Sequence, residues 1–262
     1  MRHLLSPAGL FSIQQMASLP SVLIFDLDGT LAPLVSHFSD ARVPLHTARL
    51  LTFLSRLWPI AVVTGRSVKD AEQRLGFTPD YLFGNHGAER AGQPASANLS
   101  ERLNTFRHVL HQYAIAMAAR KVVLEDKGIS LALHYRQSDN PVATCAWLHE
   151  LVDSVPTDVV ATDGHKVVNI LQPHAPDKGD ALKVIMQDSH AVSALVVGDD
   201  DNDESAFVMA PELAVTVRIG ALTTNSLAKF RLDGQHQVDL LLEFLLRQRN
   251  FIYKHAVKVQ QP

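Results

Sequence analysis

In the first third of the chain, continuous runs of apolar residues alternate with stretches in which apolar residues recur at the spacing of a helix. The runs Val22 to Phe25 and Pro59 to Val63 each predict a strand buried on both faces. A third, short strand is predicted from Tyr81 to Phe83. Leucines at helical spacing predict a helix from Pro44 to Leu57, and another helix is predicted from Val68 to Leu75. This alternation is typical of βαβ units in a parallel sheet.

The pattern changes after Glu89 to the order helix, hairpin, helix, hairpin. The predicted elements there are residues 101–120, 122–125, 130–136, 141–155, 159–161 and 166–171. Hairpins within a chain of βαβ units predict a small inserted α+β domain. The first pattern resumes at Asp177, with predicted elements at residues 179–187, 194–197, 214–217 and 238–249. We therefore expect a core domain over residues 20–89 and 174–262, an inserted domain over 90–173, and a loosely attached N-terminal extension over 1–19.

Composition and charge narrow the class of protein. The 262 residues, 47% of them hydrophobic, can supply a sizeable core, and the formal net charge of -3 argues against nucleic acid as a partner. Residues 1–20 are too broken for a signal peptide, and no stretch has the length of a membrane span. Cys145, the single cysteine, excludes an intrachain disulfide and is predicted to be a buried small hydrophobe. We expect a monomeric, cytoplasmic protein that binds neither nucleic acid nor a membrane.

Two carboxylates directly follow the first buried strand. Asp26 and Asp28 are two positions apart, so their side chains leave an extended backbone on the same side. Open α/β sheets bind ligands beyond the carboxyl ends of their strands, which is where this pair is expected to lie. The alternative is a surface turn, because the dipeptide Asp28-Gly29 is common in turns.

Four short polar segments are predicted to lie at strand ends of the core domain. They are Asp26 to Thr30, Thr64 to Arg66, Asp177 to Gly179, and Gly198 to Glu204. This set, in this order, resembles the haloacid dehalogenase superfamily. The resemblance implies an α/β fold with a doubly wound, mostly parallel sheet and an inserted α+β cap, and hydrolysis of phosphate esters through an aspartyl-phosphate. It implies that Asp26 is the nucleophile and Asp28 the general acid and base; for Asp28 the alternative is a structural turn or N-cap.

The acidic loop from Asp199 to Asp203 would repel a phosphate dianion. A divalent cation that bridges the carboxylates removes this repulsion, and Mg²⁺ prefers oxygen ligands. The resemblance implies that Mg²⁺ binds the Asp26 carboxylate, the Asp28 backbone carbonyl and the Asp199 carboxylate. Asp203 would place a water ligand or hold Lys178. A solvated loop and a calcium site are the alternatives, but the glycine and the distal glutamate of the calcium-loop pattern are missing.

Three further residues are candidates for binding the phosphate. Thr64 offers a hydroxyl donor at the end of the second strand, and Lys178 offers a compact positive charge. A Lys-Gly pair before a helix is more often at the surface, and only its place between the other motifs favours catalysis. Arg66 can either bind the phosphate or structure its loop, and both roles stay open.

The inserted domain and its borders carry the motifs for the substrate. They are Asn85 to Glu89, Glu125 to Ser130, Leu133 to Arg136, and Gly164 to Val168. Together they resemble trehalose-6-phosphate phosphatases, over residues 21–243. The resemblance implies that Glu125 and Lys127 reach the sugar hydroxyls and the phosphate. The other candidates for binding the substrate are His86, His134, Arg136, Lys166 and Asn169. For Glu125, Lys127, His134 and Arg136 the alternative is a solvated strand face with a cross-strand ion pair, which contributes under about 1 kcal/mol.

Asn169 departs from the family pattern, in which a glutamate is usual at this place in the last cap strand. Asn can still bind a sugar hydroxyl, but it is shorter and uncharged. We expect a Mg²⁺-dependent sugar-phosphate phosphatase, with trehalose 6-phosphate as the first-choice substrate. Sucrose 6-phosphate or another glucosyl phosphate is the second choice. A phospho-sugar sensor with weak catalysis is the third interpretation.

Overall fold

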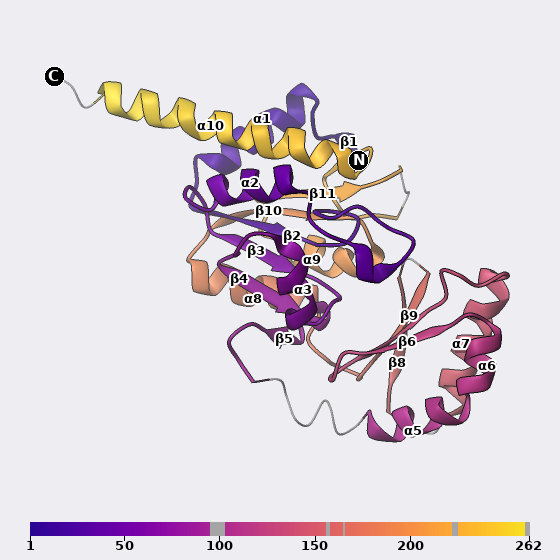
Figure 1. The fold of residues 1–262 in the computed structure, drawn as a ribbon. Coiled ribbons are helices and arrows are strands. Elements are labelled where there is room, and N and C mark those ends of the chain that lie inside the picture. Colours follow the sequence, from indigo (N-terminus) through magenta and orange to yellow (C-terminus); the bar gives the residue numbers. More distant parts are fainter. Residues whose placement is uncertain (95–102, 156–157, 165, 222–224, 260–262) are drawn as a thin grey trace. The chain divides into compact units, whose positions relative to one another are not determined.

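The computed structural model forms two compact units, one of Met1–Ala91 with Asp177–Pro262 and one of Gly92–Pro176 (Figure 1). It describes the chain except for residues 95–102, 156–157, 165, 222–224 and 260–262, and except for the side chains of residues 249–259.

The first unit is built on an eight-stranded sheet. Its order is β1 (Arg2–His3), β12 (Phe230–Leu232), β11 (Val215–Ile219), β10 (Ser193–Gly198), β2 (Ser21–Phe25), β3 (Ile60–Val63), β4 (Tyr81–Gly84) and β5 (Glu89–Arg90). All neighbouring strands in this sheet are parallel except β4 and β5. The mostly parallel α/β core expected from the sequence is therefore confirmed.

Helices cover both faces of this sheet, as Figure 1 shows. One face packs against α1 (Pro7–Ala17), α2 (Leu45–Leu54), α3 (Val68–Leu75) and α10 (Val238–Val259), and the other against α8 (Lys178–Ser189) and α9 (Glu204–Met209). Successive residues of β2 alternate between the two hydrophobic clusters: Leu23 and Phe25 belong to one, Val22 and Ile24 to the other. Burial on both faces explains why these strands are continuous apolar runs. Short 3-10 turns are η1 (Phe38–Asp40), η2 (Asn85–Gly87), η3 (Asp201–Asp203) and η4 (Gln235–Gln237).

The N-terminal segment corrects one expectation. A loosely attached extension was expected over residues 1–19, but β1 pairs with β12 at the sheet edge, and α1 is part of the core. Leu4, Ile13 and Met16 are at most 1% exposed. Apolar positions that looked too broken for a signal peptide, such as Ile13 and Met16, belong to α1, a helix that buries only one side.

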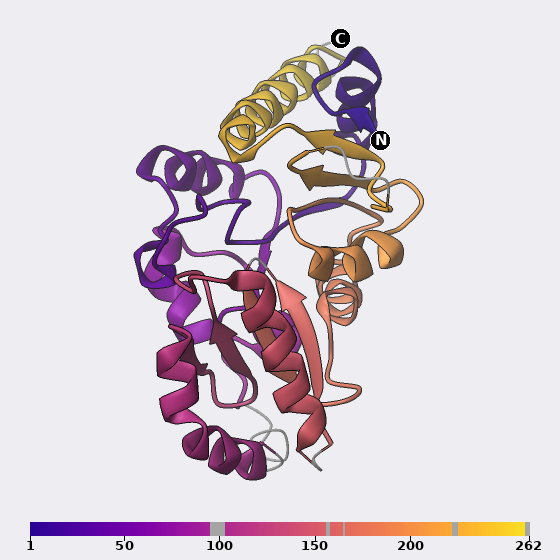
Figure 2. The ribbon, with the colours of Figure 1, turned by 90° about the vertical axis from the view of Figure 1, so that its right-hand side faces the viewer.

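The second unit is an antiparallel sheet with helices on one face (Figure 2). Its strand order is β6 (Val123–Asp126), β7 (Leu131–His134), β9 (Val167–Leu171) and β8 (Val160–Gly164). Leu131, Leu133 and Val168 pack in one cluster with residues of α5 (Asn104–Gln112), α6 (Ala114–Ala119) and α7 (Pro141–Ser154). The unit therefore has its own hydrophobic core.

Two expectations for this unit are corrected. The long helix expected over residues 101–120 is divided into α5 and α6 at Tyr113, whose φ of -94° and ψ of 8° are not helical; residues 101 and 102 lie outside the described part. Cys145 is half-buried and packs at the margin of the cluster, so it is not a fully buried hydrophobe.

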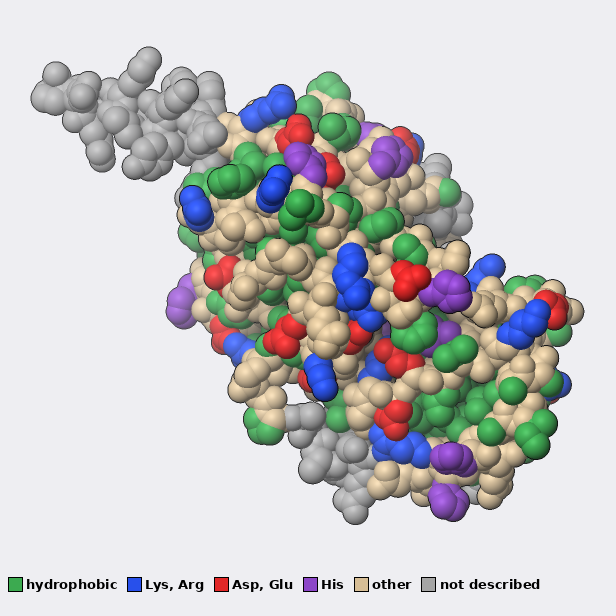
Figure 3. Space-filling model, in the orientation of Figure 1, with side chains coloured by type: hydrophobic (Ala, Val, Ile, Leu, Met, Phe, Trp, Pro, Cys, Tyr) green, Lys and Arg blue, Asp and Glu red, His purple; other side chains and the backbone are tan. Residues whose placement is uncertain are grey.

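No described helix is long and apolar enough to cross a membrane. On the face drawn in Figure 3, Lys and Arg side chains are interspersed with Asp and Glu side chains. This mixture agrees with the nearly balanced charge of the sequence.

Candidate active site

The carboxyl ends of three neighbouring strands bring the first motifs together. Phe25 at the end of β2 pairs with Val62 of β3 on one side and with Val197 of β10 on the other. The residues that directly follow these strands therefore meet at one edge of the sheet, the usual ligand-binding edge of a parallel α/β sheet. Asp26, Thr64 and Asp199 occupy these positions.

Lys178 links two of the predicted acids. As the first residue of α8, after the N-cap Asp177, it extends its ammonium group to Asp26 Oδ1 and Asp203 Oδ1, each at 2.7 Å. The other oxygen of Asp203 accepts hydrogen bonds from the backbone N–H groups of Asp199 and Asp200, both at 3.0 Å. Of the two roles expected for Asp203, the geometry supports the one in which it holds Lys178.

Asp26, Asp199 and Asp203 form a compact carboxylate group. An oxygen of each lies within 4.8 Å of the others. Two glycines allow this approach: a Cβ on Gly29, whose φ is +83°, would lie 2.0 Å from Asp199 Oδ2, and a Cβ on Gly198 would lie 2.1 Å from Asp203 Cγ. Three carboxylates beside one ammonium group are an all-oxygen donor set that fits a hard divalent cation such as Mg²⁺. The Asp28 carboxylate lies outside this group, and a ligand role for its backbone carbonyl stays a prediction.

Burial sets the proton affinity of these groups. It raises the pKa of Asp26 to about 7, an effect that Lys178 opposes and Asp203 reinforces. Burial, then the charges of Asp26 and Asp203, raise the pKa of Asp199 well above its usual value. Burial alone would lower the pKa of Lys178, but the attraction of Asp203 and Asp26 outweighs it and raises that pKa. Without a cation, burial therefore favours the protonated forms of Asp26 and Asp199, and a bound cation would favour their ionised forms.

These raised pKa values predict that Mg²⁺ stabilises the folded protein to an extent that depends on pH. Folding raises the pKa of Asp26 from 3.8 to about 7, so its protonated carboxyl contributes fully to the stability of the fold below pH 3.8. This contribution is lost as the pH rises through about 7. A cation favours the ionised form, so Mg²⁺ should raise the Tm more at pH 8 than at pH 5.5, by at least about 3 °C. Thermal unfolding in Mg²⁺ and in EDTA at both pH values measures this. Asp199→Asn should reduce the difference, and an equal Mg²⁺ effect at both pH values would contradict the prediction.

The Arg66 guanidinium binds the loop that carries Asp28 rather than lying open to a phosphate. Its Nε and Nη2 donate to the two carboxylate oxygens of Asp28 at 2.6 and 2.7 Å, and Nη1 donates to Asp70 at 2.6 Å. Nη2 also donates to the Phe38 carbonyl oxygen at 2.8 Å. Arg74 binds the same Asp70 carboxylate. Of the two roles left open for Arg66, these contacts support the structural one, in which Arg66 orients Asp28.

Thr64 and His86 lie together beside this loop. The Thr64 Oγ1 accepts a hydrogen bond from the Arg66 backbone N–H at 3.2 Å; because this bond uses an oxygen lone pair, the hydroxyl proton can be donated to a phosphoryl oxygen. His86, in η2, donates its backbone N–H to the Thr64 carbonyl oxygen at 2.9 Å. A Cβ on Gly65 would lie 2.5 Å from His86 Cε1, so the imidazole requires a glycine in the Thr64-Gly65-Arg66 turn.

In the second unit, three predicted residues share one face of the sheet. Glu125 pairs with Ala132, and Ala132 pairs with Asn169. Directly paired residues project to the same face, so Glu125 and Asn169 lie on one side with the small Ala132 between them. His134 reaches the same side, because its Nε2 lies 2.8 Å from Glu125 Oε2. This is the face opposite the hydrophobic cluster with α5, α6 and α7.

The three basic candidates lie at the two ends of this sheet. Lys127 follows β6, and its Nζ lies 3.9 Å from Glu125 Oε2. Arg136 lies beyond the end of β7, and Lys166 lies just before β9; because β7 and β9 are antiparallel, these two are at the other end. The structure thus groups Lys127 with Glu125 and His134, and separates Arg136 and Lys166 from Lys127.

Two supporting residues are missing from the sequence-based prediction. Asp70 of α3 binds Arg66, which precedes the helix, and Arg74, which lies one helical turn further on; the spacing of Asp70 and Arg74 was a usable signal. Arg218 of β11 donates to the Asp200 carbonyl oxygen at 2.6 Å and to Asp201 Oδ1 at 2.9 Å, and so anchors the acidic loop. The only sign of this role in the sequence was that Arg218 is a lone charged residue in the mostly apolar run of β11.

Comparison with known proteins identifies the family. The sequence model described as trehalose-phosphatase matches residues 24–236. The chain belongs to the trehalose-phosphatase family. The family and its relatives make it a phosphoric monoester hydrolase, as the sequence predicted.

Two relatives show how much of the chain is shared. The trehalose-6-phosphate phosphatase of Escherichia coli is 30% identical over 237 residues, which cover 84% of this chain and 85% of that protein. A bifunctional trehalose-6-phosphate synthase/phosphatase of Thermoproteus tenax is 30% identical over 239 residues, which cover 86% of this chain. This chain spans about a third of the length of that bifunctional protein, 32%.

Solved structures support the fold. The C-terminal domain of a trehalose-6-phosphate phosphatase from C. albicans matches with a TM-score of 0.78 and 20% identity over 90% of this chain and 95% of that one. A sucrose-phosphatase from Synechocystis matches with a TM-score of 0.58 and 20% identity over 88% of this chain and 98% of that one. At this identity the likeness extends to the fold alone, and it agrees with the haloacid dehalogenase-like architecture expected from the sequence.

Proposed function

We propose that this chain is a Mg²⁺-dependent phosphatase that hydrolyses trehalose 6-phosphate to trehalose and inorganic phosphate. The family and the near full-length match to the Escherichia coli relative support this substrate. The observation that carries the proposal is Lys178, whose ammonium contacts Asp26 and Asp203 at once beside Asp199. This arrangement keeps a nucleophilic carboxylate close to the positive charge that a phosphate dianion needs. A monomeric state and a cytoplasmic location stay predictions.

In the proposed reaction, Asp26 attacks the phosphorus atom. Because Asp26 Oδ1 accepts the hydrogen bond of Lys178, Oδ2 forms the new bond to phosphorus, and the bond from phosphorus to the sugar oxygen breaks. Asp28, which must carry a proton at this stage and so give up one of its two Arg66 hydrogen bonds, gives that proton to the departing sugar oxygen. A water molecule then attacks the phosphorus of the aspartyl-phosphate and gives its proton to Asp28, which releases phosphate and restores Asp26. Thr64 and Lys178 donate hydrogen bonds to the phosphoryl oxygens.

Three residues are proposed to hold the metal, and one to position the acid. The Asp26 and Asp199 carboxylates and the Asp28 backbone carbonyl would hold Mg²⁺, which when bound offsets the negative charge of the phosphate. Asp203 would hold Lys178 beside the ion. Arg66 is proposed as a positioning residue, since its bidentate contact fixes the Asp28 carboxylate.

The polar face of the second unit is proposed to bind the sugar. Glu125, Lys127 and Asn169 would contact sugar hydroxyls, which both donate and accept hydrogen bonds. His134 is proposed to brace Glu125 through their 2.8 Å contact. Three further residues stay candidates for substrate binding: His86, Arg136 and Lys166.

Phosphate release from a panel of sugar phosphates tests this proposal. Trehalose 6-phosphate, sucrose 6-phosphate and glucose 6-phosphate are compared with Mg²⁺ and with EDTA, and Asp26→Asn serves as the control for contaminating phosphatases. We expect phosphate release to be fastest from trehalose 6-phosphate and to be lost in EDTA. If trehalose 6-phosphate is hydrolysed no faster than glucose 6-phosphate, the proposed substrate is wrong although the reaction class stands. Preference for sucrose 6-phosphate supports the second choice, and tight binding without any release supports a sensor.

The departure at Asn169 predicts a gain of activity. Asn169→Glu should raise kcat/KM for trehalose 6-phosphate by roughly tenfold, because a hydrogen bond to a charged group contributes about 1.5 kcal/mol. The matched control is Asn169→Gln, which has the longer side chain without the charge and should give a smaller gain. Steady-state kinetics of the three proteins measure the effect. No change in either variant would mean that position 169 does not contact the sugar.

A further inference from the structure

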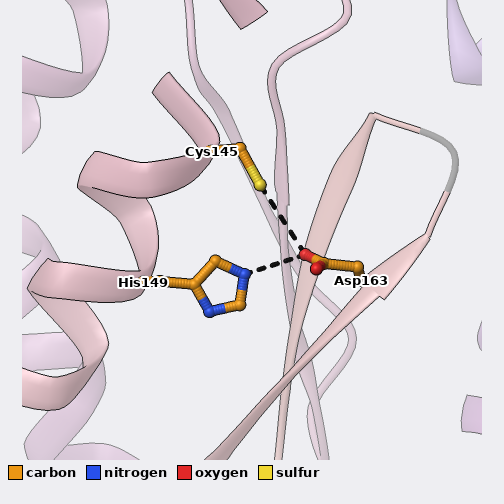
Figure 4. A group of neighbouring side chains, drawn as sticks. All are labelled: Cys145, His149 and Asp163. Carbon is orange, nitrogen blue, oxygen red and sulfur yellow. Dashed lines mark hydrogen bonds and ion pairs between the residues drawn. The ribbon is translucent and has the colours of Figure 1, made fainter. Parts of the chain in front are cut away.

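A second group of metal-binding side chains lies within the unit Gly92–Pro176, and it takes no part in the proposed reaction. Cys145 and His149 are on α7, and Asp163 is on β8; Figure 4 shows the three pointing toward one another. The Cys145 Sγ lies 3.7 Å from Asp163 Oδ1, and His149 Nε2 lies 2.9 Å from the same oxygen. One ligand atom from each lies within 4.8 Å of the others.

The local fold places these side chains in a fixed relation. Cys145 and His149 are four residues apart, so they lie on the same face of α7. Asp163 pairs across the sheet with Val168, whose side chain is in the hydrophobic cluster that α7 covers, so Asp163 projects to the α7 side. The cluster contains Leu148 and Val152 of the same helix, which hold α7 against the strands. The three ligand atoms are therefore carried by two packed elements of one unit.

The donor set differs in kind from that of the catalytic acids. A sulfur, an imidazole nitrogen and a carboxylate oxygen favour Zn²⁺ over Mg²⁺, which prefers oxygen ligands. A tetrahedral Zn²⁺ centre with usual bond lengths places its ligand atoms roughly 3.3 to 3.5 Å apart. The distances of 2.9 and 3.7 Å lie on either side of this range, so small side-chain movements are sufficient.

We propose that Cys145, His149 and Asp163 bind one Zn²⁺ ion, with the fourth position open to water. The half-buried Cys145 and His149 and the exposed Asp163 allow a cation to enter from solvent. The ion would join α7 to β8 by bonds stronger than the hydrogen bonds of the metal-free group, and its removal would loosen this contact.

Cobalt binding to the full chain tests the site, because Co²⁺ bound by a thiolate has a charge-transfer absorption in the near ultraviolet. Cys145 is the only cysteine of the chain, so any such band must come from it. We expect wild type in a non-thiol reductant to develop the band with one equivalent of Co²⁺ and to lose it when Zn²⁺ is added, because Zn²⁺ binds such sites more tightly. With excess Mg²⁺ present to occupy the catalytic carboxylates, Zn²⁺ should also raise the Tm of wild type by more than that of Cys145→Ser.

Three variants make the test specific. Cys145→Ser should abolish the band, and His149→Ala and Asp163→Asn should each weaken Co²⁺ affinity by at least about tenfold. Asp199→Asn, which alters only the catalytic carboxylate group, should keep the band unchanged, and far-ultraviolet circular dichroism confirms that each variant is folded. The proposal is overturned if wild type shows no band with excess Co²⁺, or if the band survives unchanged in both His149→Ala and Asp163→Asn.

Discussion

Replacement of Asp26 by Asn is expected to lower phosphate release from trehalose 6-phosphate by a factor on the order of 10⁴ to 10⁶, the scale seen when a covalent nucleophile is removed. An amide cannot form the aspartyl-phosphate. The amide oxygen of Asn can still accept the Lys178 hydrogen bond that Asp26 Oδ1 accepts at 2.7 Å, so the surrounding loops should stay in place. Phosphate release with saturating substrate and Mg²⁺ measures the loss.

The stability of the same variant separates loss of the nucleophile from loss of the fold. Burial raises the pKa of Asp26 because it disfavours the carboxylate, and an amide carries no such cost. In EDTA at pH 8, Asp26→Asn should therefore unfold at the same temperature as wild type or higher. An inactive variant with a clearly lower Tm would indicate structural damage, and turnover comparable with wild type would exclude Asp26 as the nucleophile.

The elements that carry the chemistry were predictable because they are short apolar runs buried on both faces. The strands β2, β3 and β10 end within about two residues of the predicted limits, and α3 has the predicted bounds Val68–Leu75. The strands β1, β5 and β12 were not predicted. They have only two or three residues, too few for any periodicity, and their pairing depends on the neighbouring strand of the finished sheet.

The approach of Lys178 to Asp26 could be expected only from the resemblance to a family. These residues are 152 positions apart, and their contact exists because α8 begins beside the end of β2. The pairing of Arg66 with Asp28, over 38 positions, was not resolved for the same reason: nothing in the order of residues distinguishes an arginine that binds phosphate from one that binds a carboxylate.

The second unit shows how a pattern can be visible and yet ambiguous. Cys145 and His149 have the helical spacing of paired ligands, but the third member, Asp163, comes from a strand whose face is set by pairing with Val168. Periodicity alone could not identify that face, since β8 has no fully buried position and its exposed and half-buried positions do not alternate. Cys145 was consequently expected to be a plain core residue.

Replacement of Asp28 by Asn is the second large effect that we expect, and it depends on the leaving group. With trehalose 6-phosphate, turnover should fall by roughly 10² to 10⁴, because a sugar alkoxide leaves poorly without a proton donor. With p-nitrophenyl phosphate, the phenolate leaves without protonation, so attack by Asp26 should remain fast. Hydrolysis of the aspartyl-phosphate should still be slow, since Asn cannot take the proton of the attacking water.

The variant should therefore release about one p-nitrophenolate per protein in a fast burst, followed by slow turnover, as covalent catalysis with a slow second step requires. Rapid-mixing absorbance measures the burst, and wild type, which keeps its general base, is the control. Asn at position 28 retains one acceptor for Arg66, and Asp70 still binds the guanidinium, so the loop should keep its shape. Equal slowing of both esters without a burst would support the turn or N-cap role for Asp28 instead. A burst of the expected size would assign the proton transfers to Asp28 and the covalent step to another residue.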